Sequence, residues 1–244
     1  MVVTAESVAS FAGLLAERSR AAMCLALLDG RAWTATELAR HAGIGRPTAT
    51  EHLNALVDAG VLAEERQGRH RYVRIARPEV AQLVEDLSAF AGSPERPTSL
   101  RTVQIRHHLA AARTCYDHLA GTLGVTVYDA LVASDLIAVQ DGLVLTPAGR
   151  EWFVALAGEP ALHPRGTRPL LRTCLDWTER RTHLGGALGA VLCQQFIERD
   201  WVTRTRYQRA IAVTAAGAEA LTNLLGVSIA ATSDQRSTDV RQVG

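Results

Sequence analysis

The chain of 244 residues contains no lysine, so all 26 of its basic side chains are arginine. This absence excludes enzymes that need an ε-amino group, such as Schiff-base and PLP enzymes, P-loop nucleotide hydrolases and protein kinases. What remains is a set of planar, permanently charged guanidinium groups, which suit the recognition of phosphate and guanine. A GC-rich genome would also favour arginine over lysine, so the missing lysine alone does not identify a function.

Aromatic residues, clustered cysteines and long apolar runs are scarce as well. Aromatic residues make up only 5% of the chain, so alanine, leucine and valine must fill its core, which favours packed helices over a β-sandwich. The four cysteines are widely spaced and form no secreted disulfide pattern. Because the chain shows no signal peptide and no apolar run of about 18 residues, we expect a cytoplasmic protein with no membrane contact and reduced thiols. The net charge of +1 restricts any nucleic-acid surface to a local patch.

Composition divides the chain into four segments. Residues 1–92 predict a first folded domain, and the segment 93–103 predicts a linker, because the stretch 91–100 at its start is rich in proline, glycine and serine. Residues 104–227 predict a second folded region. The polar residues of 228–244 predict a disordered tail.

The second region contains an internal repeat. We expect each copy to run helix, helix, short β-hairpin, helix, with Gln140-Asp141-Gly142 and residues 204–209 at the two hairpin tips. Two copies predict a pseudo-symmetric pair, since a solenoid needs more repeats. The matching segments are 113–117 with 172–176, 118–124 with 183–189, Asp135 with Asp200, and 145–151 with 213–219.

Residues 34–57 have the pattern of two helices joined by a glycine turn. Thr34 and Glu37 have the spacing of a capping box, which predicts the start of the first helix. The turn Gly43-Ile44-Gly45 precedes Pro47, which is well tolerated at the first position of a helix. The second helix is expected to bury one stripe and to present a polar face on its other side, as in a helix-turn-helix motif. The expected stripe is Ala49, Leu53, Leu56 and Val57.

A basic β-hairpin is expected to follow over residues 61–75. Five arginines, at positions 66, 69, 71, 74 and 77, fall within twelve residues on or beside it. A helix-turn-helix with such a hairpin is a winged helix, whose second helix enters the major groove of DNA while the wing contacts phosphates or the minor groove. The alternative is an ordinary solvated helix face, on which Glu51 simply pairs with an arginine. The expected DNA-contacting residues are Arg46, Pro47, Thr48, Thr50, Glu51, His52, Arg66, Arg69, His70 and Arg71.

Over about residues 10–90 the sequence resembles the ArsR/SmtB family of winged-helix transcriptional regulators. The residues that carry the resemblance are segments 36–39, 46–56, 59–62 and 67–72. The resemblance implies a homodimer packed through the helices expected at 8–17 and 78–90. It also implies a palindromic double-stranded operator and a repressor that leaves DNA when an inducer binds.

Two departures from the family pattern bear on the inducer. The helix that begins at Thr34 lacks the paired cysteines of one common family metal site, and residues 78–90 lack the histidines of the other. We therefore expect neither of the usual metal sites. The second region is also much longer than in small family members, and it resembles the second part of longer, two-part relatives.

The repeated cysteines suggest a different site. Cys115 and His118 are three residues apart, and with Cys174, Asp176 and His183 they could form a thiolate–imidazole site for a soft metal. Cys174 and His183, however, are nine residues apart and would face opposite ways on one straight helix. The alternative is that both thiols are buried at equivalent points of a duplicated fold without binding anything.

The segment 172–183 offers a second candidate. Arg172, Asp176 and Trp177 could line a small-molecule pocket, with Trp177 as its floor and an arginine facing an anion. The competing interpretation is an ion-paired helix, with Asp176 and Arg180 one turn apart. The spacing leaves both interpretations open.

These patterns predict a mainly α-helical protein with short β-hairpin wings: a winged helix followed by a duplicated, winged-helix-like region. The chain carries no catalytic motif, so we expect a sequence-specific, homodimeric DNA-binding regulator and not an enzyme. It should require no cofactor and should act as a repressor that responds to a small molecule or a metal. The alternative is a DNA-binding protein whose second region is structural or binds a protein partner.

Overall fold

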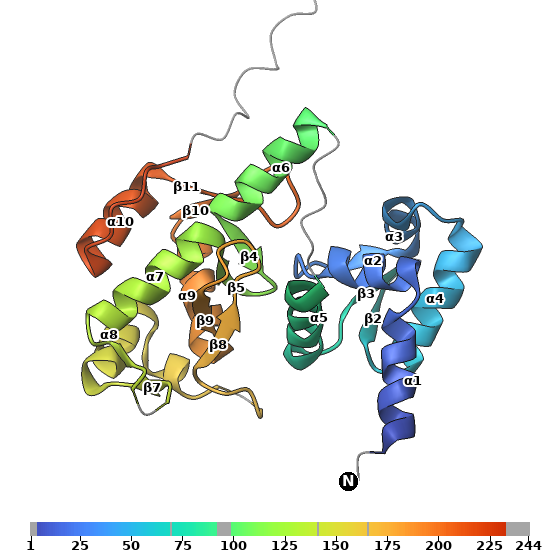
Figure 1. The fold of residues 1–244 in the computed structure, drawn as a ribbon, viewed down its shortest axis with the longest axis horizontal. Coiled ribbons are helices and arrows are strands. Elements are labelled where there is room, and N and C mark those ends of the chain that lie inside the picture. The colour runs from blue at the N-terminus through green and yellow to red at the C-terminus, as the bar shows by residue number, and fades with distance from the viewer. Residues whose placement is uncertain (1–3, 69, 92–98, 141, 165, 233–244) are drawn as a thin grey trace, which may run out of the picture. The chain divides into compact units, whose positions relative to one another are not determined.

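The computed structural model describes residues 4–68, 70–91, 99–140, 142–164 and 166–232 (Figure 1). The chain divides into two compact units, unit 1 (Met1–Leu87) and unit 2 (Ser88–Gly244). The structure is mainly helical with short antiparallel hairpins, which confirms the predicted fold class. In the described part of the chain, no helix has the length and apolar character needed to cross a membrane.

The described residues of unit 1 form a winged helix, with five helices and a small three-stranded sheet. The strand order in the sheet is β1-β3-β2, and β3 pairs antiparallel with both neighbours. The order of elements is α1 (Ala5–Leu15), α2 (Arg18–Leu27), β1 (Trp33–Thr34), α3 (Ala35–Ala42), α4 (Arg46–Asp58), β2 (Leu62–Gln67), β3 (His70–Ile75) and α5 (Pro78–Ala91), the last of which continues into unit 2.

Local sequence signals account for the helix-turn-helix of α3 and α4. The predicted capping box is present: the Glu37 amide donates to Thr34 Oγ1 at 3.3 Å, and the Thr34 amide donates to Glu37 Oε2 at 2.7 Å. Helix α3 ends at Gly43, whose φ of 69° is left-handed and favours glycine. The predicted stripe of α4 is buried at Ala49, Leu53 and Leu56 and half-buried at Val57.

Unit 2 contains the whole segment that the sequence predicted to be a linker, and residues 100–103 of that segment already belong to a helix. Residues 93–98 of that segment lie outside the described residues. The order of elements is α6 (Leu100–Ala111), β4 (Arg113–Cys115), β5 (His118–Ala120), α7 (Gly121–Ala133), β6 (Ile137–Ala138), β7 (Val144–Leu145), α8 (Pro147–Ala157), η1 (Glu159–Leu162), β8 (Arg172–Leu175), β9 (Thr182–Gly185), α9 (Gly186–Glu198), β10 (Val202–Arg204), β11 (Ile211–Val213) and α10 (Ala215–Leu225).

The repeat appears in unit 2 as two copies of one pattern: hairpin, helix, hairpin, helix. Matching residues share the same left-handed backbone, with φ of 52° at Asp135 and 54° at Asp200, and 74° at Gly121 and 78° at Gly186. The predicted pair of helices at the start of each copy is wrong, because a hairpin, β4–β5 or β8–β9, stands before the helix. The two copies pack against each other: α7 of the first copy contacts β9 of the second, and α9 of the second contacts β5 of the first.

A single apolar core runs through both copies of the repeat. It includes Leu123, Leu131 and Phe153 from the first copy and Leu188 and Phe196 from the second. The two copies therefore fold as one unit and not as two independent domains.

Two residues at the start of the predicted disordered tail, 228–244, contact the rest of unit 2. Ile229 packs against the core, the Thr232 amide donates to the Val213 carbonyl at 2.8 Å, and the Val213 amide donates to Thr232 Oγ1 at 3.1 Å. Residues 233–244 lie outside the described residues, as does Asp141 at the first predicted hairpin tip.

Candidate functional site

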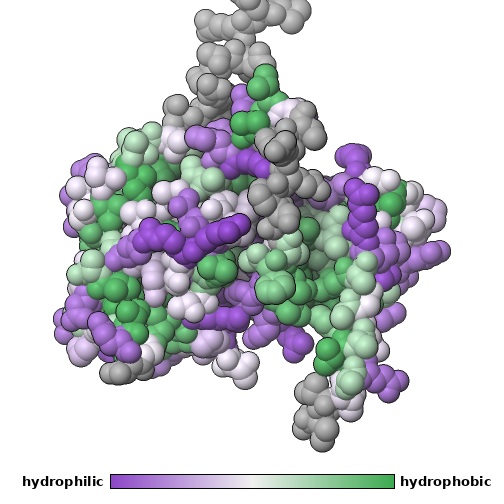
Figure 2. All heavy atoms as spheres, in the orientation of Figure 1, coloured by the Kyte–Doolittle hydropathy of each residue, from purple (hydrophilic) through white to green (hydrophobic). Residues whose placement is uncertain are grey.

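The beginning of α4 presents the exposed polar face expected of a recognition helix. Arg46, Pro47, Thr48 and Glu51 are all exposed, and the helix begins at Gly45 without a side-chain cap. Figure 2 shows hydrophilic side chains gathered on the side of unit 1 where α3 and α4 lie. Four of the predicted contact residues are thus accessible on one helix.

Two other predicted residues of α4 already have partners within unit 1. Thr50 is half-buried, and its hydroxyl donates to the Arg46 carbonyl at 2.9 Å. His52 Nε2 lies 3.5 Å from Glu17 Oε2, and only 19% of its side chain is exposed. Glu17 caps α2 by accepting from the amides of Ser19 and Arg20, and these hydrogen bonds lower the pKa of its carboxyl. His52 therefore links α4 to the start of α2.

The side chains of the wing, β2–β3, differ in how strongly they are held within unit 1. Arg66 is 75% exposed and lies 3.3 Å from Glu64, His70 is exposed, and Arg69 lies outside the described residues. Arg71 is different, because its Nη1 donates to Asn54 Oδ1 on α4 at 2.7 Å and its Nε lies 2.8 Å from Glu64 Oε2. Hydrogen bonding from Arg66 and the charge of Arg71 lower the pKa of Glu64. Arg71 thus holds the wing against the recognition helix.

Helices α1 and α5 carry apolar side chains on the surface. Helix α1 has no buried residue, and Val8 is among its exposed residues. On α5, Leu83, Leu87 and Phe90 are exposed, Phe90 to 96%. Figure 2 shows apolar residues along α1. These are the two helices through which the family resemblance implies dimerisation.

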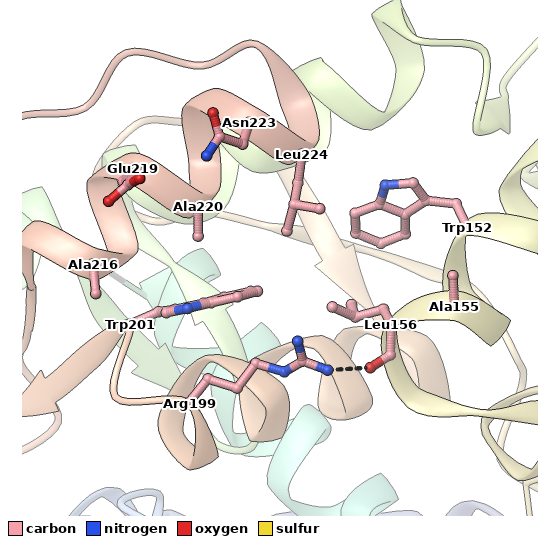
Figure 3. Close-up of a pocket in the computed structure, with 10 residues that line it drawn as sticks. All are labelled: Trp152, Ala155, Leu156, Arg199, Trp201, Ala216, Glu219, Ala220, Asn223 and Leu224. Atoms are coloured by element: carbon pink, nitrogen blue, oxygen red, sulfur yellow. Dashed lines mark hydrogen bonds between the residues drawn. The ribbon is translucent and has the colours of Figure 1, made fainter.

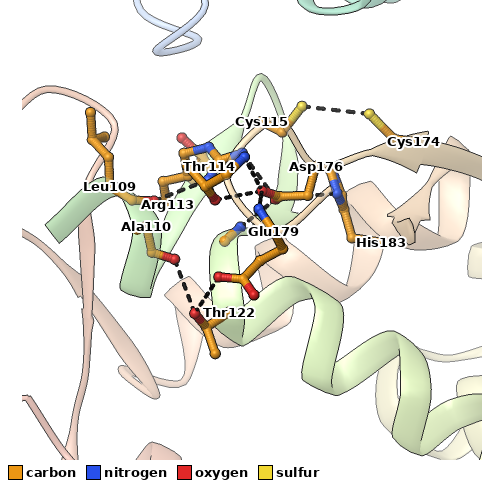
Figure 4. A network of polar contacts seen from close by, with 12 residues as sticks. Leu109, Ala110, Arg113, Thr114, Cys115, Thr122, Cys174, Asp176, Glu179 and His183 are labelled. Carbon is orange, nitrogen blue, oxygen red and sulfur yellow. Dashed lines mark hydrogen bonds and ion pairs between the residues drawn. The ribbon is translucent and has the colours of Figure 1, made fainter. Parts of the chain in front are cut away.

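In unit 2 the structure gathers four candidate ligand residues, which we call the Cys–His cluster. All four are buried, and their ligand atoms lie within 4.8 Å of one another. The Sγ atoms of the two cysteines are 3.8 Å apart (Figure 4), and the two imidazole rings stack with centroids 5.1 Å apart. Each copy of the repeat supplies one cysteine and one histidine. The members of the Cys–His cluster are Cys115, His118, Cys174 and His183.

Hairpin geometry brings these residues together. Cys115 lies directly opposite His118 in β4–β5, and Cys174 lies directly opposite His183 in β8–β9. The nine-residue separation that argued against a site assumed one straight helix, and that assumption is wrong. The sequence did contain a signal for this cluster: two cysteines and two histidines occupy matching positions of the repeat.

A carboxylate lies behind each histidine of the cluster. Asp117 Oδ1 is 3.3 Å from His118 Nδ1, and Asp176 Oδ2 is 3.5 Å from His183 Nδ1. Among the described residues, neither histidine Nε2 has a hydrogen-bond partner that meets normal geometry. Asp117 therefore orients the His118 imidazole through Nδ1, whereas Nδ1 of His183 also has no hydrogen-bond partner among the described residues.

The cluster favours a charged thiolate beside a charged imidazole. Burial disfavours a charged His118, but the hydrogen bond with Asp117 and the neighbouring Cys174 raise its pKa to about 9. The pKa of Cys174 is strongly lowered, first by its hydrogen bond with the Cys115 thiol and then, against the cost of burial, by the two imidazoles. By contrast, burial raises the pKa of Cys193, elsewhere in unit 2, to about 12.

Asp176 also anchors a polar network next to the cluster (Figure 4). Its Oδ2 accepts from Arg113 Nη2 at 2.9 Å and from the Gly121 amide at the start of α7 at 2.7 Å. Its Oδ1 accepts from the Thr178 amide at 2.9 Å and hydroxyl at 2.6 Å. Although burial opposes ionisation, the Arg113 guanidinium and these hydrogen bonds hold the pKa of Asp176 well below its usual range.

Of the other interpretations of residues 172–183, the ion-paired helix does not match the structure. The segment is a hairpin and not a helix, so the expected Asp176–Arg180 pair along a helix is wrong, and Asp176 pairs with Arg113 instead. Arg172 is exposed, and the Trp177 ring lies 4.6 Å from the Arg113 guanidinium carbon. The small-molecule pocket with Trp177 as its floor stays a prediction.

A hollow that the sequence did not predict lies elsewhere in unit 2, between α8 and α10 (Figure 3). Its volume is about 400 Å³, and Trp152 from the first copy and Trp201 from the second contribute to its lining. Arg199 lies over the Trp201 ring and donates to the Leu156 carbonyl at 2.7 Å. The sequence does not reveal this hollow, because its two sides come from residues at least 43 positions apart, the separation of Leu156 and Arg199.

Comparison with known proteins agrees with the winged helix. Residues 15–65 match a family model described as a helix-turn-helix domain. The chain is 37% identical over 224 residues to the HTH-type transcriptional regulator YdfF of Bacillus subtilis (strain 168), covering 91% of this chain and 99% of YdfF. It is 34% identical over 79 residues to a probable mercury resistance operon repressor of Streptomyces lividans, covering 32% of this chain and 62% of that protein.

Solved structures similar to the chain cover only part of it. The transcriptional repressor BigR from Xylella fastidiosa has 26% identity and a TM-score of 0.34, covering 36% of this chain and 90% of BigR. The homodimeric DNA-binding domain of Mb0332 from Mycobacterium bovis, a possible ArsR-family regulator, has 29% identity and a TM-score of 0.33, covering 35% and 79%. With the winged helix observed and YdfF matched along almost its whole length, the chain belongs to the same family of HTH-type transcriptional regulators as YdfF and acts by binding DNA.

Proposed function

We propose that the chain represses transcription in the cytoplasm by binding a palindromic operator as a homodimer, and that a ligand of unit 2 releases it from DNA. The observation that carries the proposal is the exposed face of Arg46, Thr48 and Glu51 at the start of α4, fixed to the wing by Arg71. The similar proteins include repressors, which supports repression of transcription over activation. The proposal assigns no catalytic activity to the chain.

The exposed residues would divide into two roles. Arg46 would donate to the O6 and N7 atoms of a guanine in the major groove, and Thr48 and Glu51 would contact neighbouring bases. Arg66 and His70 would contact phosphates along the wing. His52 and Arg71 would position α4 and the wing, since both have partners within unit 1.

The exposed apolar side chains of α1 and α5 support the homodimer. The apolar surfaces of Val8, Leu83 and Leu87 would be buried when two copies of unit 1 pack together. This burial would stabilise the dimer, because removing apolar area from water is favourable. A dimer of this kind would place two α4 helices on successive major grooves of a symmetric operator.

Replacing Arg46 with alanine is expected to weaken operator binding by about 5- to 150-fold and to relax the preference at one base pair, since a bidentate guanine contact contributes about 1–3 kcal/mol. The affinity for an operator selected from random duplexes, measured by fluorescence anisotropy, checks this. Arg150→Ala, which removes an exposed arginine from α8 in unit 2, is the matched control and should bind like the wild type. Equal affinities for all three proteins would contradict the role of Arg46.

Replacing Arg66 with alanine is expected to weaken binding to every DNA sequence about equally. One fewer phosphate contact releases about one fewer counterion, so the slope of log K against log salt should become shallower by about one. A titration at several salt concentrations measures that slope. If Arg66→Ala leaves it unchanged, the wing does not contact phosphate at this residue.

The response to a ligand needs its own test. Metal ions and small metabolites are screened for those that raise the melting temperature of the full chain, because a ligand of the native state stabilises it. Operator affinity is then measured with each stabilising compound, and at least one is expected to lower it. Stabilising ligands that all leave operator affinity unchanged would favour the alternative, in which unit 2 is structural or binds a protein partner.

A further inference from the structure

We propose that the Cys–His cluster binds one thiophilic divalent metal ion of the Zn²⁺ class, in a closed tetrahedral site that joins the two copies of the repeat in unit 2. The cluster contains the four ligands that such a site requires: two thiolate sulfurs and two imidazole nitrogens. It lies outside unit 1 and uses none of the residues assigned to DNA binding. The assignment therefore does not depend on the proposed operator binding.

The distances match a tetrahedral zinc site. Zinc binds sulfur at about 2.3 Å and nitrogen at about 2.0 Å, so the edges of its tetrahedron are about 3.8 Å between sulfurs and about 3.3–3.6 Å for the other pairs. The Cys115 and Cys174 sulfurs are already 3.8 Å apart. The remaining ligand atoms lie within 4.8 Å of one another, so small rotations of the two imidazoles would complete the tetrahedron.

The orientation of the histidines points to the same conclusion. Histidines that bind metals almost always donate from their other ring nitrogen to a carboxylate or carbonyl, which fixes the tautomer that binds. Asp117 supplies such a carboxylate to His118 Nδ1, and the Asp176 carboxylate lies 3.5 Å from His183 Nδ1, just outside hydrogen-bond geometry. The two Nε2 atoms are buried without hydrogen-bond partners among the described residues, and a metal ion would satisfy both.

The chemistry of the four ligands sets the class of ion. Thiolates and imidazoles select soft or borderline ions such as Zn²⁺ and Cd²⁺, whereas Mg²⁺ and Ca²⁺ prefer oxygen ligands. All four protein ligands are buried and no fifth ligand is required, which is typical of a structural site and not of a catalytic one. Because Cys115 and His118 come from the first copy and Cys174 and His183 from the second, the bound ion would cross-link β4–β5 to β8–β9.

The competing chemistry for the same atoms is a Cys115–Cys174 disulfide. Its formation would oxidise both thiols, with two electrons and two protons passing to an added oxidant, and would require the sulfurs to approach from 3.8 Å to about 2.05 Å. It would leave both imidazoles without a role. The two chemistries are separable because a disulfide needs an oxidant and a metal site needs reduced thiols.

The test titrates the reduced, metal-free full chain with Co²⁺, which substitutes for Zn²⁺ and is visible spectroscopically. We expect saturation at one ion per chain, intense visible bands typical of tetrahedral Co²⁺, a thiolate-to-cobalt charge-transfer band, and displacement by Zn²⁺. Competition with a chelator should give a Zn²⁺ dissociation constant on the order of nanomolar or tighter. Zn²⁺ at about 1,000 times that constant should raise the melting temperature of unit 2 by roughly 8–16 °C.

Variants identify the ligands. Cys115→Ser and Cys174→Ser should each lose about half of the charge-transfer intensity and bind Zn²⁺ at least 100-fold more weakly. Cys193→Ser, which changes a buried thiol of α9 outside the cluster, is the matched control and should behave like the wild type. If the cluster variants fail to fold, X-ray absorption at the zinc edge of the wild type should count two sulfurs at about 2.3 Å and two nitrogens at about 2.0 Å.

Asp117 is proposed as a positioning residue for His118. Asp117→Ala should bind Zn²⁺ about 10- to 100-fold more weakly while keeping the tetrahedral Co²⁺ spectrum, because loss of a carboxylate behind a metal-binding histidine has this effect. Asp129→Ala, which removes an exposed aspartate of unit 2, is its control. A reduced wild-type chain without a tetrahedral Co²⁺ spectrum would overturn the proposal. So would equal affinities in Cys193→Ser and the two cluster variants, or a chain that forms the Cys115–Cys174 disulfide and binds no Co²⁺ after reduction.

Discussion

Replacing Asp176 with alanine is expected to lower the free energy of unfolding of unit 2 by about 3–5 kcal/mol, because it would leave the buried Arg113 charge without its partner. Arg113 and Asp176 have side-chain exposures of only 1% and 0%, and their Nη2 and Oδ2 atoms are 2.9 Å apart. The same carboxylate accepts from the Gly121 amide at the start of α7 and from Thr178 in the β8–β9 turn. Alanine therefore removes a counter-ion and also one of the polar links between the two copies.

Denaturant unfolding followed by tryptophan fluorescence measures this loss, because three of the four tryptophans, Trp152, Trp177 and Trp201, lie in unit 2. Asp129→Ala is the matched control, because its pair with Arg181 also joins two segments of unit 2 at 2.7 Å but lies on the surface. An exposed pair of this kind contributes at most about 1 kcal/mol. Equal losses of stability in Asp176→Ala and Asp129→Ala would contradict the structural role assigned to the buried pair.

Replacing Gly124 or Gly189 with alanine is expected to cost about 3 kcal/mol of stability and to weaken Zn²⁺ binding, because each glycine lets a helix lie directly on a hairpin. A Cβ at Gly124 would stand 2.4 Å from the Leu119 carbonyl oxygen, and one at Gly189 would stand 2.5 Å from the Leu184 carbonyl oxygen. The contacted atoms belong to the backbone, so the strands must shift. Residues 119 and 184 each follow a histidine of the Cys–His cluster, so such a shift would move the ligands.

Thermal unfolding and the Co²⁺ titration measure the two effects separately. Gly13→Ala in α1 is the control: a Cβ there meets nothing within 4 Å, and alanine in place of glycine inside a helix should stabilise it by up to about 1 kcal/mol. The two cluster-adjacent variants should lose similar amounts of stability, since their positions match in the repeat. If both were as stable as the wild type, the close packing of helix on hairpin described here would be wrong.

The fold of unit 1 could be predicted from the sequence because its signals are local. The capping box of Thr34 and Glu37, the turn at Gly43 and the stripe of α4 each depend on residues only a few positions apart. The predicted DNA-contacting face followed from the same pattern. The contacts of His52 with Glu17 and of Arg71 with Asn54 could not be predicted in this way, because the partners are 35 and 17 residues apart in the sequence.

Unit 2 was harder to predict because its strands are short. Strands of three residues, such as β4 and β5, cannot show the alternation that identifies a strand, so the spacing of Cys115 and His118 was interpreted as helical. The repeat could be recognised in the sequence, and all four residues of the Cys–His cluster lie at its matching positions. What the sequence could not show was that the two hairpins face each other, because the contacts between them span about 60 residues.

The most direct test of the central claim, that α4 of two chains recognises a symmetric operator, is a footprint of the full chain on the DNA it selects from random duplexes. The account predicts one enriched sequence with two inverted half-sites, protected patches centred about 10 base pairs or a multiple apart, and loss of this pattern in Arg46→Ala but not in Arg150→Ala. Enrichment of no sequence, or a footprint unchanged by Arg46→Ala, would contradict it.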